Sequence, residues 1–492
     1  MQTEIILQDL PLLIQQEIEK ITAELGKTLN FREFEDAVMK LMYEIEAKII
    51  ERVLEDLLTA PDFLKRLKVL GGKLGMRFEE YRPLHIRLRN GLKIKISSPY
   101  FLKSKSKRGR KKKGPNGRGK HLGLALIGIL GKVSPAFLSK TVLMSLLCPS
   151  FAVAKSVLSE QGIEIAVKTL RRLSKVAGVE GMKWRGPVSL DGNEKLEGIT
   201  IVIGIDGGRL RERKRKLGRW KKGQKRQGFS TEWREPKLFT IYFLDSEGEV
   251  IRELAPIHDA TMGNHKAVFA LLEQYLSALP LEQAETIVFC GDGAPWIWSG
   301  VASLCERMLL DKSIVFQVLD YTHAKQQLGN LLDYVGKRNG SKRGKGKLDR
   351  KWKEILWNGQ IDELKAEVEK HCVGAKKVAA LKKWKMYFMK NQTRMQYQTF
   401  KDKNLPCGSG SVESAIRRVI NLRLKAAGTF WKRERAEIFL FLRSQLISGR
   451  WSVMMRNLTR QIARIFHRLN NDKLNTMQFQ PALSYTEKTE FE

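Results

Sequence analysis

The sequence is poor in the features that define several large classes of protein. Its five cysteines are widely spaced and form no C-x-x-C pair, which argues against a disulfide framework and against a zinc site. It has no run of about 18 uninterrupted apolar residues, so no membrane-spanning helix is expected. Its first residues, MQTEIILQDL, lack the basic and apolar regions of a signal peptide. We therefore expect a soluble, cytoplasmic protein with reduced thiols.

Negative charge is also scarce. The chain has 89 Lys and Arg against 53 Asp and Glu, and its formal net charge is +36. Because so large an excess repels itself unless a polyanion neutralises it, nucleic acid is the leading partner and association with the nucleoid is expected. The 492 residues are 42% hydrophobic, which is enough for several domains with hydrophobic cores.

The N-terminal third mixes helical patterns with basic segments. Residues 1–75 have the apolar spacing of core or pairing helices. Residues 76–120 combine a small β element, with the chemistry of a two-residue turn at Asn90-Gly91, and a basic arm. The arm, residues 103–120, holds ten basic residues and no acid, so it forms either a phosphate contact or a solvated loop. Lys111 and Lys112 are its candidate DNA contacts.

A second helical region is expected at residues 121–185. The stretch from Pro149 to Gly178 has the pattern of a helix, a glycine-containing turn and a second helix that carries Lys168 and Arg171. This pattern is typical of a helix-turn-helix whose second helix enters a major groove, and an ordinary helical hairpin fits it equally well.

The order of elements becomes informative from residue 199. Hairpin-connected strands followed by crossover helices build a mixed sheet with helices on its faces. The expected succession is that of an α/β ribonuclease H-like fold with a mixed five-stranded sheet and flanking helices. Its strands are expected at residues 199–206, 238–245, 249–257, 286–292 and 313–320, with helices at 264–278 and 299–309.

The sequence predicts that an insertion interrupts this domain. The interval of 121 residues from Asp292 to Glu413 is too long for a direct connection between a strand and a helix, so it predicts an insertion. We expect the core in 199–324 and 406–450, an all-α insertion in 325–405 and a C-terminal tail in 451–492.

Three acids stand at the ends of these elements. Asp206 closes the strand ITIVIGID, Asp292 closes TIVFCGD, and Glu413 opens a helix after a glycine turn that Ser409 or Ser411 would cap. Carboxylates suit Mg²⁺ or Mn²⁺, and two ions about 3.5–4 Å apart clamp the attacking and leaving oxygens of a phosphodiester. We expect Asp206 to bridge two ions that Asp292 and Glu413 complete.

Each acid also has a simpler interpretation. Asp206 and Asp292 each precede a glycine, as turn residues do, and only their joint order favours metal ligands. Glu437 is the alternative to Glu413, although it lies in the more apolar stretch AEIFLFL.

Basic and aromatic residues surround the acids in the sequence. Residues 209–226 include eleven basic residues and a single acidic residue, Glu212, and are expected to bind DNA near the scissile bond. The candidate contacts there and after Glu413 are Arg209, Arg211, Lys214, Arg417, Arg418, Arg423 and Lys425, with a solvated basic face as the alternative for the last four. Trp296 and Trp298 beside Asp292, and Trp352, Trp357 and Trp384 in the insertion, are either core residues or base-stacking residues.

Linked motifs in residues 200–445 resemble those of bacterial DDE insertion-sequence transposases of the Mutator-like group. They are IDGGRLR at Asp206, WREPKL at 233–238, CGDGAPW at Asp292, DYTHAKQQL at 320–328 and GSGSVESAIRRVINLRLKAAGTFW around Glu413. A weaker resemblance lies in FREFEDAV at 31–38. The cysteine-rich knuckle of many relatives has no counterpart in the basic arm.

The resemblance implies a DNA transposase in which Asp206, Asp292 and Glu413 hold two Mg²⁺ or Mn²⁺ ions. It also assigns an acid-x-x-His signature to Asp320 and His323, where the histidine approaches the scissile phosphate, holds a flanking nucleotide or is structural. The partners would be terminal inverted repeats and target DNA. Joining two ends to one target requires at least a dimer, and no zinc is expected.

Other functions use part of the same features. A ribonuclease H-like nuclease or resolvase needs the carboxylates without strand transfer. A non-catalytic DNA-binding protein derived from a transposase, or an RNA-binding protein, needs only the positive charge.

Overall fold

The computed structural model describes residues 2–103, 119–186, 196–216, 228–335 and 342–470, together with Gly218 and Gly223. The expected contacts Lys111 and Lys112, most of residues 217–227 and the expected tail beyond residue 470 lie outside the described residues. The chain divides into two compact units. One comprises residues 1–140, 162–164 and 455–492, and the other comprises residues 141–161 and 165–454.

The first unit combines helices with a long β-hairpin. Its helices are α1 (Gln2–Thr28), α2 (Phe31–Thr59), α3 (Pro61–Lys73), α4 (Leu122–Leu126) and most of α17 (Trp451–Asn470). The strands β1 (Met76–Arg87) and β2 (Lys93–Lys103) pair in antiparallel. Asn30 caps α2 by accepting a hydrogen bond from the Glu33 amide, and a cluster that includes Leu58, Ile86 and Ile96 is buried between helices and hairpin.

The hairpin turn is longer than the two residues expected at Asn90-Gly91. The strands end at Arg87 and resume at Lys93, and the Leu88 amide donates to the Leu92 carbonyl at 2.9 Å. The Asn90 amide group explains the difference, because it accepts from the Leu92 amide and donates to the Glu46 carboxylate, both at 2.9 Å. Asn90 is therefore held by α2 as well as by the turn.

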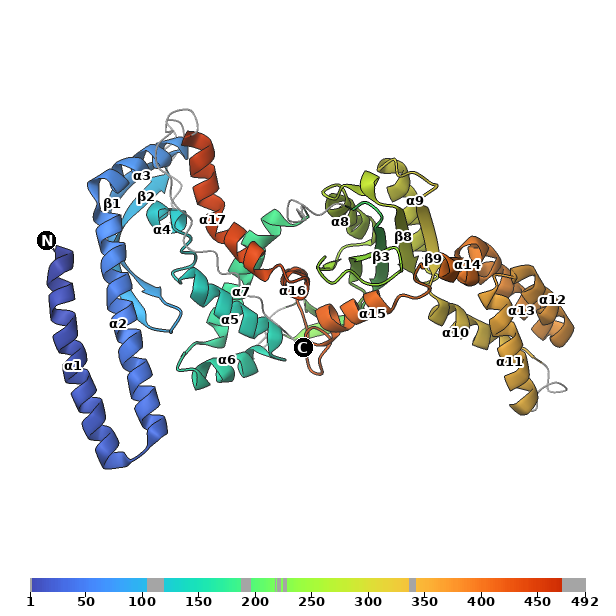
Figure 1. Cartoon of the computed structure of the whole chain (residues 1–492), viewed down its shortest axis with the longest axis horizontal. Helices are drawn as coiled ribbons and strands as arrows, with labels where there is room; N and C mark the ends of the chain where they lie inside the picture. The colour runs from blue at the N-terminus through green and yellow to red at the C-terminus, as the bar shows by residue number, and fades with distance from the viewer. Residues whose placement is uncertain are drawn as a thin grey trace. The chain divides into compact units, whose positions relative to one another are not determined.

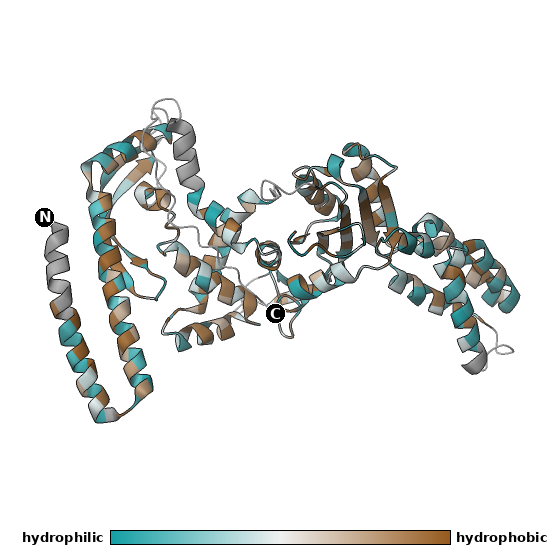
Figure 2. Cartoon of the chain, in the orientation of Figure 1, coloured by the Kyte–Doolittle hydropathy of each residue, from teal (hydrophilic) through white to brown (hydrophobic). Residues whose placement is uncertain are grey.

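The second unit is built on a five-stranded mixed sheet. Its order is β7 (Ile257–Thr261), β6 (Lys237–Leu244), β3 (Thr200–Gly207), β8 (Thr286–Gly291) and β9 (Val315–Leu319). Strand β6 is antiparallel to β3 and β7, while β3, β8 and β9 are mutually parallel. This mixed α/β sheet is compatible with the expected ribonuclease H-like fold (Figure 1). Its central strands are almost continuously hydrophobic (Figure 2), as strands buried on both faces are.

The third expected strand, 249–257, is wrong in position. The edge strand is Ile257–Thr261, and before it the Asp245 carboxylate accepts from the amides of Glu247 and Glu249 in a tight turn. The strand was hard to detect because three of its five buried residues, His258, Asp259 and Thr261, are polar.

Helices cover both faces of the sheet. On one face lie α8 (His265–Leu276) and α9 (Pro295–Arg307), with the Tyr275 ring against Phe239. On the other lies α15 (Gly410–Ile416). Gly204 allows its close approach, because a Cβ at Gly204 would lie 3.0 Å from the Cβ of Val412. The central sheet thus meets the Glu413 helix directly.

Helices also fill the chain between β9 and α15. They are α10 (Tyr321–Leu332), α11 (Lys342–Trp357), α12 (Ile361–His371), α13 (Gly374–Tyr387), the 3-10 helix η4 (Met389–Arg394) and α14 (Tyr397–Asp402) (Figure 1). Trp352 and Trp384 are buried in their core. Trp357 is half-buried and donates to the Gln398 amide oxygen, so all three tryptophans pack within these helices.

Three further helices and one π-helix also belong to the second unit. They are α6 (Phe151–Glu160), α7 (Val167–Gly181), the π-helix η5 (Arg417–Asn421) and α16 (Arg433–Ile447), joined by the C-terminal half of α5 (Pro135–Leu147). Helix α7 packs on α16, where a Cβ at Gly178 would clash with Ile438. Among the described helices, none is long and apolar enough to cross a membrane.

Candidate active site

Asp206 and Asp292 emerge side by side from the sheet. Ile205 pairs with Gly291 in the parallel ladder of β3 and β8, and each acid is the next residue along the chain. Carboxyl ends of parallel strands form the edge at which α/β sheets bind ligands. Asp206 Oδ1 accepts from the Gly207 amide at 2.5 Å, and Asp292 Oδ1 accepts from the Ala294 amide at 2.8 Å. The second oxygen of each carboxylate accepts no hydrogen bond within the described chain.

Glu413 reaches the same edge from the facing helix. It lies in the first turn of α15, where its amide donates to the Ser409 carbonyl at 3.0 Å, and its side chain is exposed. An acidic side chain in the first turn is favoured by the helix dipole. Asp206 and Asp292 thus lie on neighbouring strands, and Glu413 lies near enough for its charge to act on Asp206.

The electrostatics of Asp206 reflect this crowding. The pKa of Asp206 is raised to about 6, mainly by burial and also by the charges of Asp292 and Glu413, while the Gly207 amide and His323 oppose the shift. Neighbouring carboxylates repel one another when they are all ionised, and a bound cation offsets that repulsion. The cluster therefore has the donor chemistry of a divalent metal site.

Asp320 follows β9 at the same edge, but both of its carboxylate oxygens accept hydrogen bonds. Oδ1 accepts from the Thr322 amide at 2.6 Å, and Oδ2 accepts from the Ser409 amide at 3.2 Å and from the Ser409 hydroxyl. His323 Nδ1 lies 3.2 Å from Oδ2. Burial disfavours the charged form, but the bonds from His323, Ser409 and the Thr322 amide outweigh it and hold the pKa of Asp320 at about 2.

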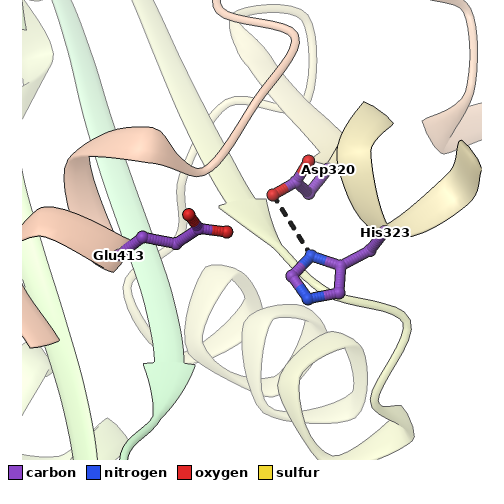
Figure 3. A group of neighbouring side chains, drawn as sticks. All are labelled: Asp320, His323 and Glu413. Atoms are coloured by element: carbon purple, nitrogen blue, oxygen red, sulfur yellow. Dashed lines mark hydrogen bonds and ion pairs between the residues drawn. The ribbon is translucent and has the colours of Figure 1, made fainter. Parts of the chain in front are cut away.

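Asp320, His323 and Glu413 form a compact group in Figure 3, where the Glu413 carboxylate faces the hydrogen-bonded pair. One ligand atom from each lies within 4.8 Å of the others, a spacing compatible with a divalent metal ion. The hydrogen bond to Asp320 raises the pKa of His323, and burial opposes that shift. A histidine that tends to be protonated is a weaker metal ligand and a better hydrogen-bond donor.

Ser409 has a different role from the expected helix cap. Its side chain makes no capping bond to α15 and donates to Asp320 instead. The bond ties the start of the Glu413 helix to the end of β9, which neither residue's local sequence indicates.

Aromatic residues fix the backbone around Asp292. Trp298 is buried, its indole donates to the Asp292 carbonyl at 2.9 Å, and the Arg394 guanidinium lies 4.6 Å from its ring centre. Trp296 is half-buried against Phe269 at 6.4 Å between ring centres. Both tryptophans of the CGDGAPWIW stretch therefore pack in the core.

Tyr387 of α13 is a neighbour that the sequence did not indicate. Its ring packs so closely on Gly293 that a Cβ there would clash. Burial raises the pKa of Tyr387, and the charges of Asp292 and Asp320 add to the shift. The tyrosine lies far along the chain from both acids, so no local signal could have found it.

The expected DNA-contacting cations lie in different environments. Arg209, Arg417, Arg418 and Lys425 are exposed, Arg211 is half-buried, and Lys214 pairs with Glu232 at 2.9 Å. Lys168 and Arg171 are exposed on α7, and the Arg171 guanidinium lies 5.5 Å from the Phe151 ring centre.

Arg423 was expected to hold phosphate, and this is wrong. It is only 2% exposed, its Nε donates to the Ser145 carbonyl at 3.0 Å, and its guanidinium lies 5.1 Å from the Trp431 ring centre. Its position in the sequence, among exposed arginines, gave no sign of this burial.

Glu437, the alternative third acid, has other partners. It pairs with Arg185 at 2.6 Å and accepts from the Met262 amide at 2.6 Å and the Thr261 hydroxyl at 3.1 Å. Arg185 also pairs with Asp259 at 2.8 Å, so Glu437 belongs to a network at the β7 edge.

Comparisons with known proteins add little. No family model matches the chain, and no curated protein sequence matches it. It is similar to a solved structure titled the Drosophila P element transposase strand transfer complex, with 9% sequence identity and a TM-score of 0.22. That match covers 69% of this chain and 86% of the other. A likeness at this level supports no inference about fold or function.

Proposed function

We propose that this protein is a DNA transposase in which Asp206, Asp292 and Glu413 hold two Mg²⁺ or Mn²⁺ ions. One observation carries the proposal: three carboxylates from separate parts of the chain converge at one edge of a sheet compatible with the ribonuclease H-like fold. The net charge of +36 supports DNA as the partner.

The residues fit such ions in their donor chemistry. Asp206 and Asp292 each keep a carboxylate oxygen that no described residue engages, and the Glu413 carboxylate is exposed. Oxygen ligands of this kind are those that Mg²⁺ and Mn²⁺ prefer. Asp320, whose oxygens already accept several hydrogen bonds, fits better as an orienting residue.

The chain's own residues act mainly by positioning. Asp206 stands on the central strand, Trp298 and the Ala294 amide fix Asp292, and Asp320 holds the start of the Glu413 helix through Ser409. If these residues bind two divalent ions, the metal site would supply Lewis-acid activation of the attacking oxygen and positive charge for the leaving oxygen. His323, with Nδ1 against Asp320, has Nε2 available to donate to a phosphate oxygen.

Under this proposal the substrates are the terminal inverted repeats of a mobile element and a target duplex. The same site would first hydrolyse the bond at an end and then join the released 3′-hydroxyl to target DNA. Two ends meet one target in that reaction, so a homo-oligomer of at least two chains is part of the proposal.

The test is an assay on duplex DNA that carries the inverted repeats flanking the coding region, with Mg²⁺ or Mn²⁺. Cleavage at the repeat followed by joining to a second duplex supports a transposase. Cleavage without joining supports a nuclease or resolvase, and binding with neither supports a non-catalytic DNA-binding protein. Asp206→Asn serves as the matched inactive protein.

A further inference from the structure

The segment that follows Asp206 forms a two-stranded ribbon. Strands β4 (Leu210–Arg215) and β5 (Phe229–Arg234) pair in antiparallel, with Arg211 opposite Trp233 and Arg213 opposite Thr231. Opposed residues in such a pair share one face of the ribbon. Alternation therefore places every second residue from Arg209 on the same face as Trp233 and Phe229.

On this face, arginines alternate with aromatic rings. The guanidinium carbons of Arg209 and Arg211 lie 5.6 and 5.5 Å from the Trp233 ring centre, and that of Arg213 lies 5.6 Å from Phe229. Phe430 extends the set, 4.8 Å from the Arg211 guanidinium carbon and 5.5 Å from the Phe229 ring centre. We call these six residues the arginine–aromatic face.

The rings are unusually accessible. Trp233 is 52% exposed and Phe229 is 42% exposed, in contrast to the buried Trp298 and Trp352. Large aromatic side chains normally bury most of their surface in a core. Exposed rings held between arginines are instead the arrangement that proteins use to stack nucleic-acid bases.

The two faces of the ribbon differ in charge. On the opposite face, Glu212 pairs with Arg234 at 3.0 Å and Glu232 pairs with Lys214 at 2.9 Å. Within the described part of the chain, no carboxylate pairs with Arg209, Arg211 or Arg213. The arginine–aromatic face therefore keeps its positive charge for an external anion.

The ribbon is anchored to both sides of the candidate active site. Arg209 lies three residues after Asp206. The Trp431 amide donates to the Arg211 carbonyl at 2.9 Å, and the Arg213 amide donates to the Trp431 carbonyl at 2.8 Å. Trp431 is buried at the end of the segment that begins with Glu413. The ribbon therefore starts beside Asp206 and is held by the segment that carries Glu413.

We propose that the arginine–aromatic face binds unpaired nucleotides of the DNA strand that flanks the scissile bond. This inference rests on the proposed function and names the DNA form that the ribbon recognises. A base can stack on Trp233 only when its own face is free, and in duplex DNA neighbouring base pairs cover those faces. The arginines would hold the phosphates on either side of the stacked base.

The test measures DNA binding by the full-length protein in EDTA, so that cleavage plays no part. The probes are a fluorescent oligothymidylate of about 12 nucleotides and a blunt duplex that carries the inverted repeat. Trp233→Ala should weaken oligothymidylate binding roughly 5- to 100-fold, the range expected when one base can no longer stack, and change duplex binding less than about 2-fold. Trp233→Phe should restore most of the affinity.

Controls separate this face from general effects. Lys312→Ala removes an exposed cation from the turn before β9, and Phe31→Ala removes an exposed ring from α2 in the other unit. Both should leave the oligothymidylate affinity unchanged. Arg213→Ala, at an exposed strand position, gives a second weakened variant if Trp233→Ala folds poorly.

The outcomes distinguish this inference from the proposed function. Equal weakening on both probes, or no weakening by either Trp233→Ala or Arg213→Ala, would overturn the inference while cleavage and joining by the unmodified protein still support a transposase. If the unmodified protein binds neither probe, the inference and the proposed function both fail.

Discussion

At the scale of single residues, the acids at the sheet edge divide into two kinds. Asp206, Asp292 and Glu413 keep carboxylate oxygens that accept no hydrogen bond from the described residues, whereas both oxygens of the buried Asp320 accept hydrogen bonds. The first kind is suited to binding a cation, and the second to holding neighbouring groups in place. Substitutions of the two kinds of acid should therefore reduce DNA cleavage to different extents and for different reasons.

Replacing the first three acids tests the proposed metal site. Asp206→Asn, Asp292→Asn or Glu413→Gln should reduce DNA cleavage by more than the roughly 10- to 100-fold that removing a ligand's supporting group costs. Binding of the inverted repeat in EDTA should change by less than about 3-fold, because the many basic residues supply it. A fully active Glu413→Gln variant would remove Glu413 from the site.

Replacing Asp320 or Ser409 tests positioning. Asp320→Asn and Ser409→Ala should each lower the cleavage rate roughly 10- to 100-fold, because the start of α15 loses its link to β9. Ser409→Thr keeps the hydroxyl and should recover most of the rate at the same Mg²⁺ dependence. A loss as deep as that of Asp206→Asn, without any recovery in Ser409→Thr, would instead place Asp320 among the metal ligands.

His258 predicts a pH dependence of stability. It is 2% exposed, neither ring nitrogen has a hydrogen-bond partner in the described chain, and burial lowers its pKa from 6.5 to about 3, helped by Arg418 and Arg450. The unfolded chain binds the proton below pH 6.5 and the folded chain does not, so stability falls as the pH drops through this window.

The expected loss between about pH 7 and about pH 5 is about 2 kcal/mol in the free energy of unfolding. Urea unfolding at several pH values measures it. His258→Leu should remove this part of the pH dependence whatever its effect on stability at neutral pH. If the free energy of unfolding depends on pH equally in the two proteins, His258 binds its proton as readily in the folded chain as in the unfolded chain, and the prediction is wrong.

At the scale of elements, the segment behind Glu413 is held by a buried arginine. Helix α15 continues into the π-helix η5, a form that is often found at functional sites. Arg443 of α16 is 3% exposed and donates to the carbonyls of Val419 at 2.8 Å and Leu146 at 2.6 Å, and to that of Arg418. Burial lowers the pKa of Arg443 to about 10, so it stays charged at neutral pH.

Arg443→Met should therefore loosen the Glu413 segment. It leaves buried carbonyls without a donor, each of which costs about 1–3 kcal/mol. We expect a loss of about 2–4 kcal/mol in the free energy of unfolding, together with reduced cleavage. Arg456→Met, at an exposed position of α17, is the matched control and should change stability by less than about 0.5 kcal/mol. Equal effects of the two variants would contradict the role of Arg443.

At the scale of the whole molecule, positive charge is spread unevenly along the chain. The stretch 103–120 is basic without an acid, whereas α1 and α2 carry many acids. Binding that releases counterions depends on the number of phosphates neutralised, so its salt dependence counts those phosphates. The basic arm can be tested in this way although its role in phosphate binding rests on sequence alone.

Replacing Lys111, Lys112 and Lys113 by glutamine should weaken binding of the inverted repeat and flatten its salt dependence. The slope of log affinity against log salt should fall by about 0.9 for each phosphate that the arm no longer neutralises. Anisotropy titrations between about 50 and 200 mM salt measure it. Unchanged slopes would make the arm a linker.

The sequence by itself determined the central strands and the acids at their ends. Apolar runs such as ITIVIGID and TIVFCGD are local patterns, and the residue after a buried strand must emerge at its edge. The mixed five-stranded sheet was predicted on that basis and is confirmed, whereas metal binding by Asp206, Asp292 and Glu413 stays a prediction.

Only the tertiary structure decided the partners of the polar residues. The burial of Arg423, the bond from Ser409 to Asp320, the pairing of Glu437 with Arg185 and the ribbon with Trp233 exposed each join segments distant in sequence. The hydrophobic periodicity of a short stretch can be read from its own sequence, but the residues that will pack against it in the fold cannot. Because burial and hydrogen bonding depend on those packing partners, they are determined only when the chain has folded.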